Sequence, residues 1–140
     1  MKSLEYLTVI LAALFLLHCK TCEIKDNSTT IFSYPNSTSF EMTEEIKLFV
    51  DKAAKCLEEN PEMNIVITGH SDDQGTYEQN DERAKARANT IADYLVGRGI
   101  EKRRVMALSK GSIEPIASNQ TEAGKRKNRR VEIKIISEKI

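Results

Sequence analysis

The stretch GHSDDQGTYEQNDERAKARA, residues 69–88, joins a nearly continuous apolar run to a helical pattern. Asp72 comes just after the apolar run, beyond the carboxyl end of a predicted strand, where α/β proteins usually place ligand contacts. On the helix that follows, Asn80 and Arg87 are seven residues apart, so they differ by only about 20° in direction and share one flank. A carboxylate and a guanidinium that face one shallow pocket from two sides suit a zwitterionic ligand. An internal salt bridge between Asp72 and Arg87 is an equally good interpretation of this spacing.

The rest of the chain alternates between strand and helix patterns. One helix is predicted over residues 43–60, where apolar residues recur three and one apart, and a second over residues 80–96. Four strands are predicted from β-branched or alternating apolar runs, over residues 29–34, 64–70, 103–111 and 129–136. The order strand, helix, strand, helix, strand, strand predicts a two-layer α/β (α+β) fold in which helices cover one face of a mixed sheet.

Size and charge limit the classes of protein to consider. A chain of 140 residues with 40% apolar residues is long enough for one compact core and too short for two ordinary domains. The formal net charge is zero, which argues against a general attraction to nucleic acid. The basic run KRKNRR, residues 125–130, is therefore interpreted as a solvated turn that leads into the last strand, in preference to a nucleic-acid patch.

The N-terminus has the pattern of an export signal, predicted over residues 1–18. Lys2 precedes an apolar run over residues 7–17 that is shorter than the roughly 20 residues of a membrane-spanning helix. Cys19 follows this run, as in the lipobox of bacterial lipoproteins, so lipidation of its thiol is the preferred interpretation. An uncleaved signal anchor and soluble export are the alternatives, and all three place the domain outside the cytoplasm. The polar residues 19–28 are predicted to form a flexible tether, and residues 29–140 the domain.

No residue pattern predicts a catalytic or metal site. Cys56 lies on an apolar helical face and is interpreted as a small buried hydrophobe, although a disulfide with Cys22 is compatible with an oxidising compartment. Ser71 and His70 are neighbours in an extended segment, so their side chains are expected to point in opposite directions. The chain is therefore predicted to have no enzymatic activity, no cofactor and no metal.

Several blocks of the sequence resemble the OmpA-like peptidoglycan-binding family. The family pattern G-H-T-D-x-x-G, an Asn, L-S-x-x-R-A, Y-L-x-x-x-G-I and N-R-R-V-E-I appears here as GHSDDQG, Asn80, RAKARA, YLVGRGI and NRRVEI. The resemblance covers residues 29–136. It differs from the family at Ser71, which replaces Thr and keeps the hydroxyl, and at Arg83 and Ala84, which replace Leu-Ser and add a charge on the ligand flank.

The resemblance implies roles for individual residues. In the family, the positions of Asp72 and Arg87 hold the free end of meso-diaminopimelate in the peptidoglycan stem peptide. The same blocks supply the further candidate ligand-binding residues Asn80, Ser71 and Gly75, and the candidate supporting residues Asn128, Arg129 and Arg130. For this last group, holding the binding loops is at least as good an interpretation as ligand contact.

The function implied by the resemblance is non-catalytic binding of peptidoglycan, which would tether the envelope to the cell wall. The expected location is the periplasmic face of the outer membrane, with attachment through a lipid on Cys19. The expected partners are peptidoglycan, the membrane and other envelope proteins, but not nucleic acid. A structural or partner-docking protein that keeps the fold without binding the wall is the alternative, and a peptidoglycan hydrolase is a more distant one.

Overall fold

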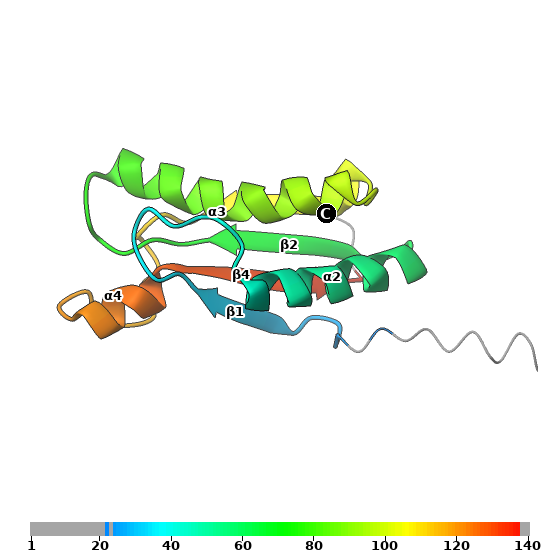
Figure 1. Ribbon diagram of the computed structural model, residues 1–140, viewed down its shortest axis with the longest axis horizontal. Helices are drawn as coiled ribbons and strands as arrows, with labels where there is room; N and C mark the ends of the chain where they lie inside the picture. Colours follow the sequence, from blue (N-terminus) through cyan, green and yellow to red (C-terminus); the bar gives the residue numbers. More distant parts are fainter. Residues whose placement is uncertain (1–21, 23, 138–140) are drawn as a thin grey trace, which may run out of the picture.

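The computed structural model describes residues 22 and 24–137, and these form the predicted two-layer α/β fold (Figure 1). The elements follow in the order β1 (Thr29–Ser33), α2 (Glu44–Glu59), β2 (Asn64–Gly69), α3 (Tyr77–Gly97), the 3₁₀ turn η1 (Lys102–Arg104), β3 (Val105–Ser109), α4 (Glu122–Asn128) and β4 (Arg130–Ile136). The sheet has the order β1-β4-β2-β3. Strand β4 is antiparallel to both β1 and β2, whereas β2 and β3 are parallel. The sheet is therefore mixed, as predicted.

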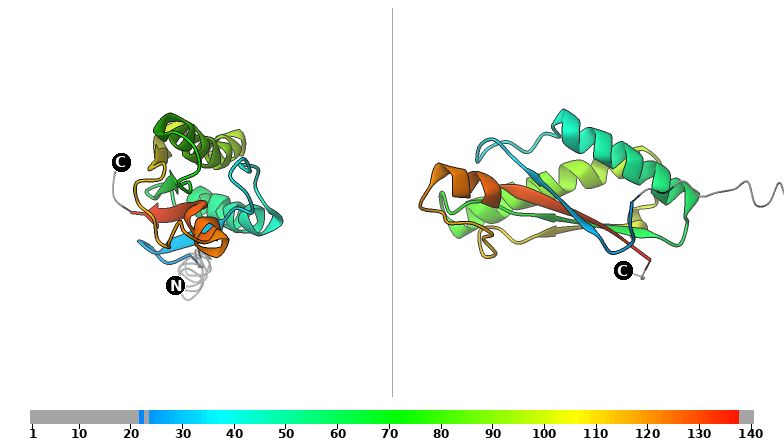
Figure 2. Two further views of the ribbon diagram at one scale, coloured as in Figure 1. Left: turned by 90° about the vertical axis from the view of Figure 1, so that its left-hand side faces the viewer. Right: turned by 90° about the horizontal axis from the view of Figure 1, so that it is seen from below.

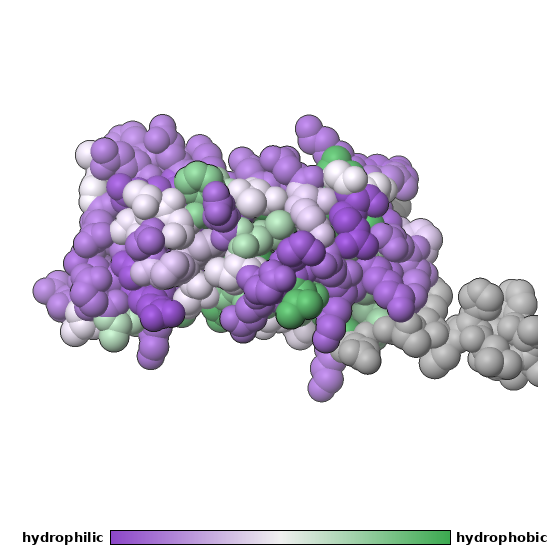
Figure 3. All heavy atoms as spheres, viewed as in Figure 1, coloured by the Kyte–Doolittle hydropathy of each residue, from purple (hydrophilic) through white to green (hydrophobic). Residues whose placement is uncertain are grey.

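The two long helices cover one face of the sheet (Figure 2). The core between the layers is formed by residues that alternate along the strands, such as Ile65 and Ile67 of β2 and Ile133 of β4, together with the apolar stripes of the helices. The pairing of Ile67 with Ile133 places both side chains on the same face of the sheet. The outer surface seen in Figure 3 is mostly hydrophilic, with apolar residues in small groups.

Side-chain caps fix where the long helices begin. The Thr43 side chain accepts a hydrogen bond from the backbone N–H of Ile46 at the start of α2. At the start of α3, Thr76 and Gln79 form a reciprocal capping box. Helix α3 therefore begins at Tyr77, about one turn before the predicted start at Asn80.

Gly69 allows α3 to lie directly against the end of β2. A Cβ atom at this position would collide with the backbone carbonyl of Ala84, so a larger residue would push the helix away from the sheet. This close approach brings the third turn of α3 beside the loop that follows β2. The predicted ligand residues Asp72 and Arg87 stand on these two neighbouring segments.

The basic run differs from its prediction, whereas Cys56 combines the two interpretations that the sequence left open. The basic run 125–130 was predicted to be a solvated turn, but most of it lies in helix α4, which Thr121 caps by accepting from the N–H of Gly124. Cys56 is buried, as predicted, and it also forms a disulfide with Cys22, 34 residues away in the sequence.

The stretch 19–28, predicted to be a flexible tether, is attached to the domain in its described part. Besides the disulfide, the Asp26 carboxylate accepts from the N–H and hydroxyl of Ser137, and the N–H of Asn27 donates to the carbonyl of Ile135. The predicted signal and Cys19 lie outside the described residues. Within residues 22 and 24–137, none of the helices has the length and apolarity needed to cross a membrane.

Candidate functional site

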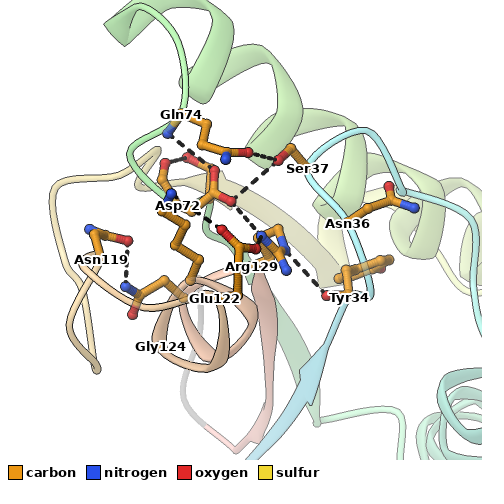
Figure 4. Close-up of polar contacts among 12 residues, drawn as sticks. Tyr34, Asn36, Ser37, Asp72, Gln74, Asn119, Glu122, Gly124 and Arg129 are labelled. Atoms are coloured by element: carbon orange, nitrogen blue, oxygen red, sulfur yellow. Dashed lines mark hydrogen bonds and ion pairs between the residues drawn. The ribbon is translucent and has the colours of Figure 1, made fainter.

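The Asp72 carboxylate lies at the bottom of the site and has no exposed surface. Its Oδ2 atom is 2.7 Å from Nη1 of Arg129, which comes from the junction of α4 and β4 (Figure 4). The backbone N–H of Gln74 and the hydroxyl of Ser37 also donate to this carboxylate, each at 3.3 Å. Because both charges are buried, the pair depends on these hydrogen bonds to offset the loss of hydration.

Arg129 also connects the carboxylate to the loop between β1 and α2, residues 34–43, which we call the β1–α2 loop. Its Nη2 atom donates to the carbonyl of Pro35 at 3.1 Å, and its Nε atom donates to the carbonyl of Tyr34 at 3.5 Å. The Ser37 hydroxyl contacts the side-chain oxygen of Gln74 at 2.6 Å as well as Asp72. The β1–α2 loop is thus joined directly to the loop that carries Asp72.

Arg87 is buried in α3, and its guanidinium donates to backbone carbonyls on both sides. Nη1 donates to the carbonyl of His70 at 2.7 Å. The other bonds go to the β1–α2 loop, with acceptor oxygens on Ser39 at 2.9 Å, Ser37 at 2.9 Å and Asn36 at 3.2 Å. The guanidinium also lies over the ring of Tyr34, 4.8 Å from its centroid. Arg87 therefore holds the β1–α2 loop against the end of β2.

Burial changes the pKa values of both Arg87 and Tyr34. The pKa of Arg87 is lowered to about 10, mainly by burial and also by the guanidiniums of Arg129 and Arg83, against the opposing effects of Tyr34 and Asp72. Burial raises the pKa of Tyr34 to about 12, against the opposing effect of Arg87. Arg87 therefore stays cationic and Tyr34 neutral at neutral pH.

The structure brings Asp72 and Arg87 to one site, but it contradicts the predicted salt bridge between them and their predicted partial exposure. No ion pair joins these two residues in the described chain, because Asp72 pairs with Arg129 and Arg87 pairs with carbonyls. The sequence predicted a partly exposed pocket, whereas both side chains are 0% exposed. The β1–α2 loop causes this difference, because it covers the site and satisfies the guanidinium.

The remaining predicted ligand residues surround this centre. Asn80 is buried and its amide donates to the hydroxyl of Ser112, while the Ser71 hydroxyl donates to the carbonyl of Asp72. Gly75 is exposed just before α3 and has a φ of 101°, a conformation that favours glycine. Gly75 thus lets the loop that carries Asp72 turn into α3, and Asn80 is connected to this loop through Arg83, which donates to both Asn80 and the Gln74 carbonyl.

The three candidate supporting residues have separate roles. Arg129 is the ion-pair partner of Asp72 and belongs to the site. Asn128 accepts from the N–H groups of Ile116 and Ala117, so it holds the loop before α4. Arg130 points to the other face of the sheet, where it pairs with Glu132 at 2.7 Å. The interpretation as loop support therefore fits Asn128.

Sequence reasoning did not identify two side chains at the centre of the site, Ser37 and Gln74. The polar composition of SYPNSTS, residues 33–39, was the only signal, and it does not indicate which hydroxyl reaches Asp72. Two hollows of about 370 and 340 Å³ flank the β1–α2 loop, and both are lined by Thr38 and Phe40. The loop is thus bordered by open space on two sides although the charged groups beneath it are covered.

The geometry offers no nucleophile activated by a base at this site. The Ser71 hydroxyl donates to a backbone carbonyl, while the buried His70 ring lies near Arg130 and Glu132. Burial, aided by Arg130, lowers the pKa of His70 to about 4, so this ring is neutral at neutral pH. In the part of the chain that the structure describes, no group of three or more His, Cys, Asp or Glu side chains could hold a metal ion.

Comparison with known proteins agrees with this architecture. Residues 34–129 match the sequence pattern of the OmpA family. The chain is 34% identical over 110 residues to outer membrane protein A of Bordetella avium, a match that covers 79% of this chain and 55% of the relative. It is 39% identical over 84 residues to the peptidoglycan-binding protein ArfA of Mycobacterium bovis, covering 60% of this chain and 26% of the relative.

A solved structure of similar shape is the peptidoglycan-associated lipoprotein from Burkholderia pseudomallei. The TM-score is 0.70 at 25% sequence identity, and the match covers 75% of this chain and 88% of that one. By contrast, the chain spans about half or less of the two sequence relatives named above.

Proposed function

This chain belongs to the OmpA family, and from that premise we propose that it binds peptidoglycan without degrading it and so tethers the bacterial envelope to the cell wall. The ligand in this proposal is the free end of meso-diaminopimelate in the stem peptide. The observation that supports it best is the placement of Asp72 and Arg87 beneath one loop, each with polar groups that a ligand could replace. The names of the relatives include peptidoglycan-binding and peptidoglycan-associated proteins.

Binding requires the ligand to replace the β1–α2 loop as the hydrogen-bond partner of Arg87 and Asp72. The ligand carboxylate would replace loop carbonyls on Arg87, and its negative charge would strengthen hydrogen bonds in which only the guanidinium is now charged. The ligand ammonium would donate to Asp72 where the Ser37 hydroxyl now does. The loop that carries Asp72 would be kept in place during this exchange by Ser71, by Gly75, by Arg129 and, through Arg83, by Asn80.

The first expected result is that the purified chain sediments with diaminopimelate-type sacculi and releases no soluble fragments from them. Sedimentation at low and moderate salt measures the binding, and chromatography of the supernatant measures turnover. Sacculi whose stem peptides carry lysine in place of diaminopimelate are the control, because they lack the carboxylate that would meet Arg87. A chain that stays in the supernatant with both materials would favour the alternative, a structural or partner-docking protein with the same fold.

We also propose that the domain is exported by the signal over residues 1–18 and is anchored through a lipid on Cys19, facing the periplasm from the outer membrane. The support is the position of Cys19 directly after the apolar run. Several acyl chains on one residue would give stable attachment, at about 0.8 kcal/mol per buried methylene. Residues 29–140 would then form the wall-binding domain, with other envelope proteins as additional partners.

Cys19→Ser is expected to move the protein from the membrane fraction to the soluble fraction of the envelope, because serine has no thiol to modify. Immunoblotting of the separated fractions measures this shift. Cys22→Ser is the matched control, since it changes a nearby cysteine that takes part in the disulfide with Cys56 and should leave the membrane fraction unchanged. Retention of the Cys19→Ser protein in the membrane would instead indicate an uncleaved signal anchor.

A further inference from the structure

The buried centre of the site contains more positive than negative charge. The guanidiniums of Arg87 and Arg129 are buried there with Asp72, the only buried carboxylate of the described chain, and the half-buried Arg83 adds a third cation beside the exposed Glu82. Arg129 takes this carboxylate as its partner. A second acid, Glu122, approaches Arg129 only to 4.0 Å, and its side chain is 75% exposed. An excess of cationic charge favours a ligand with more than one carboxylate.

Arg83 has neutral hydrogen-bond partners in the described structure. Its Nη1 atom donates to the backbone carbonyl of Gln74 and, at 3.1 Å, to the side-chain oxygen of Asn80. These two acceptors hold the guanidinium at the mouth of the site, half-buried, on the same helix as Arg87. The four-residue spacing puts Arg83 about 6 Å along the helix axis from Arg87.

An open hollow lies beside Arg83. Its volume is about 340 Å³, and it is lined by Thr38, Phe40, Gln79, Glu82, Arg83 and Ala86. Phe40 is 48% exposed and offers an apolar wall. This volume falls within the range of ligand pockets, which combine apolar walls with a few placed polar groups. A ligand that reaches Arg87 under the β1–α2 loop would therefore extend past Arg83.

We propose that Arg83 is a specificity-determining residue that binds a second carboxylate of the same wall peptide. This proposal rests on the proposed function. In a stem peptide the glutamyl residue before diaminopimelate is linked through its γ-carboxyl group, so its α-carboxylate is free. Some cell walls carry this group as the acid and others as the amide. Arg83 would distinguish them, because a guanidinium binds a carboxylate with charge-assisted, often bidentate hydrogen bonds that a neutral amide cannot reproduce.

Two dipeptides test this assignment, γ-D-glutamyl-meso-diaminopimelate and the same dipeptide with its α-carboxylate converted to an amide. The purified chain is expected to bind the acid about tenfold or more tightly than the amide, as measured by calorimetric or NMR titration. In Arg83→Gln the affinity for the acid should fall to that for the amide, while the affinity for the amide stays unchanged. Lys85→Gln is the matched control, because it removes an exposed cation of the same helix that pairs with Asp81 outside the hollow, and it should preserve the preference for the acid.

The outcomes separate this inference from the proposed function. Equal affinities of the unmodified chain for acid and amide would overturn the role of Arg83 while leaving diaminopimelate binding in place. An equal loss for both dipeptides in Arg83→Gln would also overturn it, since Arg83 would then only support the loops through Gln74 and Asn80. If neither dipeptide nor sacculi bind the chain, the proposed function itself is wrong, and the assignment of Arg83 fails with it.

Discussion

Replacement of Arg87 by alanine is expected to lower the free energy of unfolding by about 3–5 kcal/mol and to abolish binding to sacculi. The substitution removes four hydrogen bonds to backbone carbonyls and a contact with the Tyr34 ring. It also leaves a cavity under the β1–α2 loop, because the side chain is 0% exposed. Urea unfolding followed by circular dichroism measures the stability, and sedimentation with sacculi at a temperature where the variant is folded measures the binding.

Arg98→Ala is the control for this experiment. Arg98 lies at the C-cap of the same helix, and its bonds to Asp51 and Glu58 are at the surface, so its loss should cost at most about 1 kcal/mol. Binding to sacculi should be unchanged in this variant. An Arg87→Ala protein as stable as the unmodified chain would show that the guanidinium does not hold the β1–α2 loop.

The regular elements were predictable because their signals are local. The helix over residues 43–60 and the four strands follow from apolar periodicity, which depends only on which face of each element is buried. Periodicity did not predict α4, since Glu122–Asn128 is short and its sequence, EAGKRKN, has no apolar stripe. The early start of α3 was missed for a related reason, because the capping box at Thr76 and Gln79 precedes the apolar pattern.

The site was only partly predictable because its contacts join distant segments. Asp72 and Arg129 are 57 residues apart in sequence, and nothing in the spacing of either identifies the other. The bonds of Arg87 end on backbone carbonyls, which have no sequence signature. An arginine is also expected at the surface unless it is paired. The sequence thus placed Asp72 and Arg87 near one another but could not predict that the β1–α2 loop covers them.

The burial of these charges has a consequence for recognition. A loop that already satisfies Arg87 competes with the ligand, so the measured affinity is the difference between ligand contacts and loop contacts. Small uncharged molecules offer Arg87 no better acceptor than the carbonyls do. A carboxylate does, because its charge strengthens each hydrogen bond in a site shielded from water. The covered site therefore favours charged ligands over neutral ones.

Asp72→Asn is expected to cost about 3–5 kcal/mol of stability, because it leaves the buried Arg129 with only the exposed Glu122, at 4.0 Å, as an anionic partner. Asparagine has nearly the same shape, so the loss arises from charge and not from a cavity. In the variant, an NH₂ group replaces one of the two carboxylate oxygens. This NH₂ group either faces the donor Arg129 or takes the place of an oxygen that accepts from Ser37 or Gln74. Binding to sacculi should fall with the charge, since the ligand ammonium loses the carboxylate that it would meet. Urea unfolding and sedimentation again provide the two measurements.

Asp73→Asn supplies the matched control, because it makes the same chemical change at the neighbouring exposed aspartate and should alter neither the stability nor the binding to sacculi.

A double-mutant cycle with Arg129→Met measures the interaction between Asp72 and Arg129. If the two buried charges depend on each other, Asp72→Asn combined with Arg129→Met should be more stable than the sum of the single losses predicts, by about 0.5–3 kcal/mol. Additive losses would mean that Asp72 is stabilised by the Gln74 N–H and the Ser37 hydroxyl alone. In that case Arg129 could bind a ligand carboxylate in place of Asp72. Arg129→Met would then weaken binding to sacculi, although the cycle shows no coupling energy between Asp72 and Arg129.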